Sequence, residues 1–297
     1  MRTFFWFLGL LAAAFAAMAL CAYPAWLLLH PHFDFPFHRI ASRVGMLALL
    51  IGFVSVARRL GLADRVSLGY GIARRVFLRE FLLAFALGVG LMLAVVAVML
   101  GMGLRTWQPG LDLHAPLLTL LALKTLSSAL AVAFIEETFL RGAMFSGIAR
   151  ESGTRAAILL TALIYAATHF IARYHIPAEL VVPSSGLAMV EGSLQAFADP
   201  LGIGDAYLAL FAVGVLLAAV RAATGHIAAC IGLHAGWVWI MLFVRETSIP
   251  DTTRRLSFLL SSFDGFVGWL VLAWTLVIGW PLYRFYVRRT AAIRYAG

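Results

Sequence analysis

Three ionisable residues, Glu136, Glu137 and Arg141, interrupt a long apolar stretch in the segment FIEETFLRG. A charged side chain at the centre of a bilayer costs about 2.5–3.5 kcal/mol, so each of them needs a compensating partner. In a helix Glu137 and Arg141 lie on one face, four residues apart, which allows an ion pair. Glu136 is rotated about 100° from Glu137 and is not obviously satisfied by that arginine. The spacing therefore predicts a paired Glu137 and an unpaired Glu136, which could act as a general base.

Two histidines within apolar segments are the other candidates for chemistry, His169 in YAATHF and His234 in GLHAGW. Glu136 and His169 each lie 14 residues from the arginine that marks the inner end of its segment. At 1.5 Å per helical residue, both should lie roughly 21 Å from the inner membrane surface. His234 should lie roughly 12 Å in if its helix begins at His226. Because residues at matching depth on neighbouring helices can meet, we expect Glu136 and His169 to be partners.

Two hydrolytic chemistries fit these residue types. Zinc or another divalent metal, held by Glu136, His169 and His234, could activate water. Alternatively, no cofactor is needed if Glu136 deprotonates water directly with help from a histidine. The spacing HExxH of the common zinc peptidases is absent, and no serine or cysteine has a recognisable nucleophile setting. Two readings without hydrolysis are a buried ion-pair cluster that fastens helices together and a proton relay in a transporter.

The composition places these residues in a membrane protein. Apolar residues make up 63% of the 297 residues and charged residues only 12%, whereas a soluble domain is about half apolar and a quarter charged. The net charge of +9 comes from arginines at the ends of apolar runs, which is how membrane topology is encoded. We therefore expect an all-α polytopic protein whose surroundings are the lipid bilayer and which has no nucleic-acid partner.

A membrane span needs about 20 apolar residues. One integral-membrane domain, 1–297, with a motif-bearing core at about 117–245, is the simplest organisation. Residues 61–79 resemble a basic amphipathic segment on the inner surface. Eight segments meet or approach the required length: 4–29, 40–57, 81–103, 117–150, 155–172, 206–222, 226–244 and 265–287.

The arginines also predict an orientation. With the N-terminus inside, the inner loops and tails hold fourteen arginines and the outer loops hold seven. Positive residues are enriched on the cytoplasmic side of membrane proteins. We therefore expect both termini in the cytoplasm.

The residues that could do chemistry resemble the motifs of the CPBP membrane proteases, the family of the CAAX prenyl endopeptidases and the bacterial bacteriocin-processing and immunity proteins (the ABI type). The first family motif, EExxxR, matches Glu136, Glu137 and Arg141. The second, FxxxH, matches YAATH, in which Tyr165 replaces phenylalanine before His169. Motifs in this order are typical of the family.

The third family motif is a histidine followed four residues later by asparagine or a similar polar residue. In this chain it reads HAGWV, so that His234 matches and Val238 stands at the polar position. The indole N–H of Trp237 or Trp239 could replace the missing donor, and Trp237 shares the face of His234 more closely.

The resemblance implies an intramembrane endopeptidase in the cell (inner) membrane, with a membrane-associated protein or peptide as substrate. Glu136 and His169 would activate the attacking water, and His234 would stabilise the oxyanion. Glu137 and Arg141 would hold the geometry of the site. The alternative within the same family is a non-catalytic bacteriocin-immunity or scaffold protein.

Overall fold

The computed structural model describes residues 1–33, 35–110, 114–171 and 174–295. Over these residues it is helical apart from loops and one pair of short antiparallel strands, β1 (Arg105–Trp107) and β2 (Ser248–Pro250). Seven helical segments of the described chain are long and apolar enough to cross a membrane. The predicted all-α polytopic architecture is confirmed. The chain forms two compact units, Met1–Ala63 with Ala167–Leu201, and Asp64–Ala166 with Gly202–Gly297.

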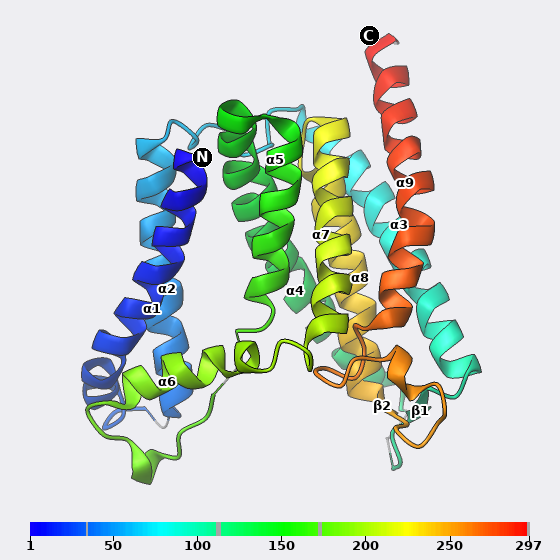
Figure 1. Ribbon diagram of the computed structural model, residues 1–297. Helices are drawn as coiled ribbons and strands as arrows, with labels where there is room; N and C mark the ends of the chain where they lie inside the picture. The colour runs from blue at the N-terminus through cyan, green and yellow to red at the C-terminus, as the bar shows by residue number, and fades with distance from the viewer. Residues whose placement is uncertain (34, 111–113, 172–173, 296–297) are drawn as a thin grey trace. The chain divides into compact units, whose positions relative to one another are not determined.

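The first unit is built on two long helices, α1 (Arg2–Leu29) and α2 (Phe37–Arg59), which lie side by side. The short helix α6 (Ser185–Leu194) packs against α1 (Figure 1). The contact is close because Gly186 lies against the backbone of α1, where a Cβ atom would meet the carbonyl oxygen of Ala19. The core of this unit contains Met18, Ala22, Phe37, Ala41, Ile176 and Met189.

The second unit holds the glutamates of the motif and is centred on helix α8 (Ala228–Thr247). Within the apolar stretch of α8, 67% of the residues are buried, against 22% in α3, so α8 is the helix that the others surround. In Figure 1, α7 and α9 lie side by side and α8 lies beside α7. The other helices of the unit are α3 (Arg74–Gly101), α4 (Ala115–Glu137), α5 (Phe145–Thr168), α7 (Gly204–Thr224) and α9 (Trp269–Tyr295), with the 3-10 turn η4 (Ser257–Leu259).

Glycines let α3 and α8 pack closely. A Cβ atom added to Gly88 of α3 would lie 2.6 Å from the carbonyl oxygen of Leu233, and one added to Gly236 of α8 would lie 2.7 Å from that of Phe85. Such small-residue contacts are typical of membrane helices that approach through their backbones. His234 follows Gly232, another glycine of this interface, by two residues, which is a rotation of about 200°. The glycine face of α8 against α3 therefore turns His234 toward the opposite side of the helix.

The predicted spans 117–150 and 155–172 form one helical stretch, Ala115–Thr168, in the structure. This stretch of 54 residues counts as one of the seven segments, although it is long enough for the two crossings that we expected. The stretch is not straight, because Gly153 has φ 85° and ψ 164°, values outside the helical region that glycine adopts without steric cost. It also contains the π-helix η1 (Thr138–Met144).

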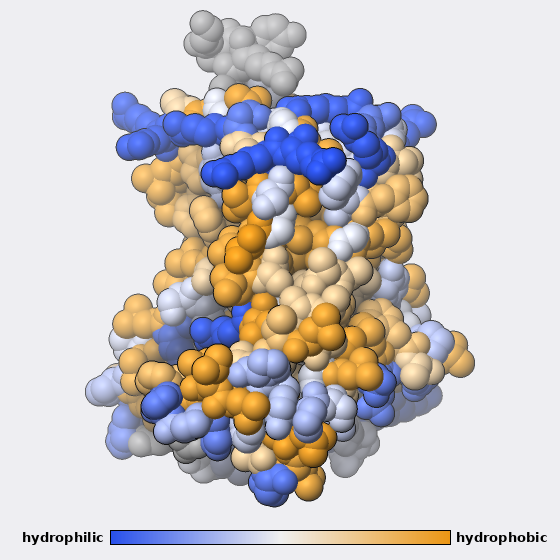
Figure 2. All heavy atoms as spheres, turned by 90° about the vertical axis from the view of Figure 1, so that its left-hand side faces the viewer, coloured by the Kyte–Doolittle hydropathy of each residue, from blue (hydrophilic) through white to orange (hydrophobic). Residues whose placement is uncertain are grey.

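The other helix ends differ from the predicted ones by up to eight residues, and the expected amphipathic segment has another structure. Residues 61–73 form turns and bends instead of an amphipathic surface helix, and Arg74 begins α3. The arginines at 74, 75 and 79 therefore belong to the first turns of a membrane helix. On the face shown in Figure 2, hydrophobic residues cover the middle and hydrophilic ones form a band near one end, as expected for a protein in a bilayer.

The glycine contact predicts opposite effects for two substitutions in α3. Gly88→Ala should destabilise the protein by about 1–3 kcal/mol, because its Cβ atom would push the backbone of α8 away. Gly90→Ala is the matched control, since no atom lies within 4 Å of a Cβ atom there. It should be neutral or stabilising by up to about 1 kcal/mol. Thermal unfolding in detergent measures both, and equal effects of the two substitutions would contradict the close contact.

Candidate active site

The two glutamates of the motif lie at a change of helix type. Helix α4 ends at Glu137, and the π-helix η1 follows directly. Short π-helical turns are rare and are frequently found at functional sites. The side chain of Glu137 is fully buried, whereas 33% of the side chain of Glu136 is exposed. Adjacent residues of one sequence motif thus occupy different environments.

Glu137 accepts two charge-assisted contacts on one carboxylate oxygen. Nη1 of Arg141 donates to Oε1 of Glu137 over 3.0 Å, so the predicted ion pair is present. Nδ1 of His234 lies 2.8 Å from the same oxygen. Because an ionised carboxylate only accepts hydrogen bonds, Nδ1 is the nitrogen that carries the proton. All three side chains are buried, so the contacts form in a medium where they are stronger than in water.

Arg141 is fully buried and is fixed from several sides. Its Nη2 donates to the carbonyl oxygen of Gly214 on α7 over 3.1 Å. The guanidinium carbon lies 4.6 Å from the ring centre of Tyr165 on α5, in cation–π geometry. The backbone carbonyl of Arg141 accepts from Nε of Arg221 over 2.9 Å. Residues of α5 and α7 therefore hold the arginine that neutralises Glu137.

The loop before α3 packs on the π-helix. The hydroxyl groups of Tyr70 and Thr138 are 2.6 Å apart, and Ser146 donates to the carbonyl oxygen of Ser67. A Cβ atom on Gly142 would lie 2.9 Å from the carbonyl oxygen of Leu68, so only glycine fits this approach. Burial raises the pKa of Tyr70, which therefore stays a neutral hydrogen-bonding group. These contacts hold η1 and the first turn of α5 against the loop before α3.

The other edge of His234 faces Glu136. Nε2 of His234 lies 4.0 Å from Oε2 of Glu136. Neither atom has a hydrogen-bond partner among the described residues, although both are buried. The ring of Tyr165 contacts His234 edge to face, with the ring centres 5.8 Å apart. Glu137 and Tyr165 thus orient the imidazole, and its remaining nitrogen points to the partly exposed glutamate.

The predicted pairing of Glu136 with His169 stays a prediction. His169 follows the last residue of α5, Thr168, and belongs to the first compact unit, whereas Glu136 belongs to the second. The helix therefore ends just before the histidine instead of continuing to residue 172.

Of the two candidate oxyanion donors, Trp239 is already occupied. Its indole N–H donates to the carbonyl oxygen of Ala122 over 3.0 Å, and its ring stacks on Phe85. In this structure the indole N–H of Trp239 is thus not free to donate to an oxyanion. Trp237 is buried in the apolar cluster that includes Leu233, and Val238 is half-buried. The role of Trp237 as a donor stays a prediction.

A metal held by Glu136, His169 and His234 would need three ligands, and of these Glu136 and His234 lie close together in the structure. Glu136 and His234 would supply one oxygen and one nitrogen ligand. Within the part of the chain that the structure describes, no group of three or more histidine, cysteine or acidic side chains is placed to hold a metal ion.

Two residues of this site were not identified from the sequence. Arg221 is one of the fourteen arginines counted on the inner side, where arginines usually mark topology, but its side chain is buried against η1. Gly214 lies within an apolar run that gives no sign of a role, yet it permits close approach to Ala162 and its carbonyl oxygen accepts from Arg141. For Arg221 the sequence offers one signal, since this arginine lies within the predicted span 206–222 and not beyond its end.

The two glutamates should differ in their contribution to stability. Glu137→Gln removes the charge that balances the buried Arg141, and breaking a buried pair costs about 3–5 kcal/mol. Glu136→Gln is the matched control, because this side chain is partly exposed and forms no ion pair with Arg141. Its effect should stay within about 0.5 kcal/mol. Thermal unfolding in detergent tests the difference. A Glu136→Gln protein as unstable as Glu137→Gln would refute the division of roles.

One family matches the chain. Residues 118–240, 123 of the 297, match the family described as Type II CAAX prenyl endopeptidase Rce1-like. Comparisons with curated proteins and with solved structures found no match. The matched region contains all the motif positions, from Glu136 to Val238, and confirms the resemblance that those motifs indicated. Residues 118–240 are therefore similar to the type II CAAX prenyl endopeptidases of the Rce1-like family, which are proteases.

Proposed function

We propose that the chain is an intramembrane endopeptidase that hydrolyses a peptide bond of a membrane-associated protein or peptide, with Glu136 as general base. One observation carries the proposal: Nε2 of His234 and Oε2 of Glu136 face each other at 4.0 Å, and both lack protein partners among the described residues. A water molecule at about 2.8 Å from each would make an angle of about 90° between them, which hydrogen-bonding geometry allows. Glu136 could then take its proton.

The reaction needs one proton acceptor that later becomes a proton donor. As the water oxygen bonds to the carbonyl carbon of the substrate, Glu136 takes a proton and the carbonyl oxygen becomes an oxyanion. When the tetrahedral intermediate collapses, the C–N bond breaks and Glu136 returns the proton to the leaving nitrogen. His169 is the proposed second partner of Glu136 in the activation of water, on the basis of the family resemblance.

His234 can act in two ways in this scheme. With its Nδ1 proton directed to Glu137, the neutral ring presents Nε2 as an acceptor, which can orient the attacking water. To donate to the oxyanion, the ring must carry protons on both nitrogens. The carboxylate of Glu137 lies 2.8 Å from Nδ1 and holds the orientation of the ring in either case. Glu137 and Arg141 are therefore proposed as positioning residues, which act through His234.

An apolar groove next to the site supports a substrate that reaches it from the membrane. It has a volume of about 520 Å³ and lies between α3, α4 and α8. Ile135, the neighbour of Glu136 in the chain, is one of its lining residues. Phe77, Phe81 and Phe134 also line it, so it suits an apolar segment or lipid group of a substrate.

We place the protein in the cell (inner) membrane with both termini in the cytoplasm. The excess of arginines in the loops and tails assigned to the inner side supports this orientation. A reporter that fluoresces only in the cytoplasm, fused to the C-terminus, should therefore be fluorescent. A fusion without fluorescence would show that the C-terminus lies outside the cytoplasm and would contradict this orientation.

Glu136→Gln should abolish cleavage of the natural substrate while the protein remains folded and inserted. We expect a loss of at least about 10²-fold, the usual contribution of a general base. Comparative proteomics of membrane-protein termini in wild-type and variant strains measures the loss and identifies the substrate.

The matched control is Glu246→Gln, the same substitution at an exposed glutamate of α8 in the same unit. New termini should appear in the wild type and in this control but not in Glu136→Gln. Retained cleavage by Glu136→Gln would refute the assignment. Normal biological function of Glu136→Gln, without any cleavage in the wild type, would instead favour the immunity or scaffold protein.

A further inference from the structure

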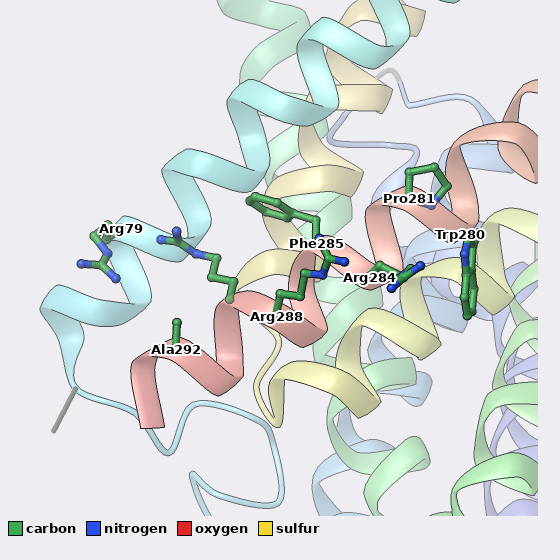
Figure 3. A pocket seen from close by; sticks show the side chains of 8 residues that line it. Arg79, Trp280, Pro281, Arg284, Phe285, Arg288 and Ala292 are labelled. Carbon is green, nitrogen blue, oxygen red and sulfur yellow. The ribbon is translucent and has the colours of Figure 1, made fainter. Parts of the chain in front are cut away.

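We propose that the second unit contains a binding site for an anionic phospholipid, in the groove between the beginning of α3 and the end of α9. The groove has a volume of about 860 Å³. Figure 3 shows Arg79 of α3 on one side and the side chains of α9 on the other. The lining residues combine four cations with aromatic and apolar groups: Arg79, Trp280, Pro281, Arg284, Phe285, Arg288, Arg289 and Ala292.

The charges of this groove are only partly neutralised by the protein. Arg289 is committed to Glu80, because its Nη2 and Nε donate to the two carboxylate oxygens over 2.8 and 2.9 Å. Arg79 also lies 3.6 Å from Glu80 and is mostly exposed. Arg284 and Arg288 are exposed and form no ion pair with any described residue. Four guanidinium groups thus share one carboxylate, which leaves an excess of about three positive charges for an anion.

The side chains of α9 are arranged as an amphipathic lipid needs. Trp280, Arg284, Arg288 and Ala292 follow each other at intervals of four residues and therefore form one face of the helix. The guanidinium group of Arg284 lies 5.7 Å from the ring centre of Trp280. Tryptophan and arginine together are typical of the level at which a bilayer changes from hydrocarbon to headgroups. This face can bind a phosphate at its arginine end and hydrocarbon at its tryptophan end.

A second groove offers a path for the acyl chains. It is mainly apolar, has a volume of about 640 Å³ and lies between α5, α7 and α9. Trp280 lines both grooves, and Leu272 and Leu276 continue the second one toward the beginning of α9. A free phosphate ion would use only the arginines, whereas a phospholipid would use both grooves. Basic pockets between membrane helices are known to bind anionic headgroups.

The test measures lipid binding to the purified full-length protein in detergent by native mass spectrometry. Phosphatidylglycerol and phosphatidylcholine with the same acyl chains are the probes. We expect the wild type to retain one phosphatidylglycerol molecule in preference to phosphatidylcholine. In the variant Arg284→Gln/Arg288→Gln the affinity for phosphatidylglycerol should fall on the order of thirtyfold, since each arginine near an anionic surface contributes about a fivefold factor.

Arg74→Gln/Arg75→Gln is the matched control, because it removes the same charge from exposed positions of α3 that do not line the groove. This control should keep the preference for phosphatidylglycerol. The variant Arg284→Lys/Arg288→Lys should keep part of it, since lysine binds phosphate as a point charge. An equal loss in the Arg74/Arg75 control, or no preference in the wild type, would overturn the proposal. Displacement of phosphatidylglycerol by inorganic phosphate alone would also overturn it in favour of a free-phosphate site. Peptidase activity enters none of these measurements, so their outcome is independent of the proposed function.

Discussion

The buried carboxylate of Glu137 is the interaction on which the rest of the second unit depends. A carboxylate without partners would be very costly inside an apolar helical bundle. Arg141 from η1 and His234 from α8 supply the two contacts that make it tolerable. Since α4, η1 and α8 meet at this single oxygen, the same contact fastens the helices and orients the imidazole. Structural support and site geometry therefore share one group.

Two backbone features allow that convergence. Gly88 lets α3 approach α8 closely, and this approach turns His234 toward the glutamates. The second feature is the π-helix η1, which begins directly after Glu137 and brings Arg141 into contact with Gly214 and Tyr165. Because packed interiors leave few voids, a change in either feature should displace the imidazole of His234.

The arginines of this chain serve two physical purposes. Arg141 and Arg221 are buried and satisfy carboxylate or carbonyl oxygens inside the second unit. Arg284 and Arg288 are exposed at the end of α9, where guanidinium groups meet lipid headgroups. The guanidinium group suits both settings, since it is always charged and presents several donors in a fixed plane. Its surroundings decide which use applies.

The sequence by itself determined what depends on spacing within one segment. It predicted the ends of the membrane helices to within eight residues. It also predicted the pair of Glu137 and Arg141 and the separate environment of Glu136, because helical periodicity relates such neighbours directly. Only the tertiary structure decided that His234 binds Glu137 and that Arg221 supports η1. These contacts join residues that are far apart in the chain, so they depend on the rotation of each helix and on the distance between helices. The glycine contacts and the π-helical turn determine both.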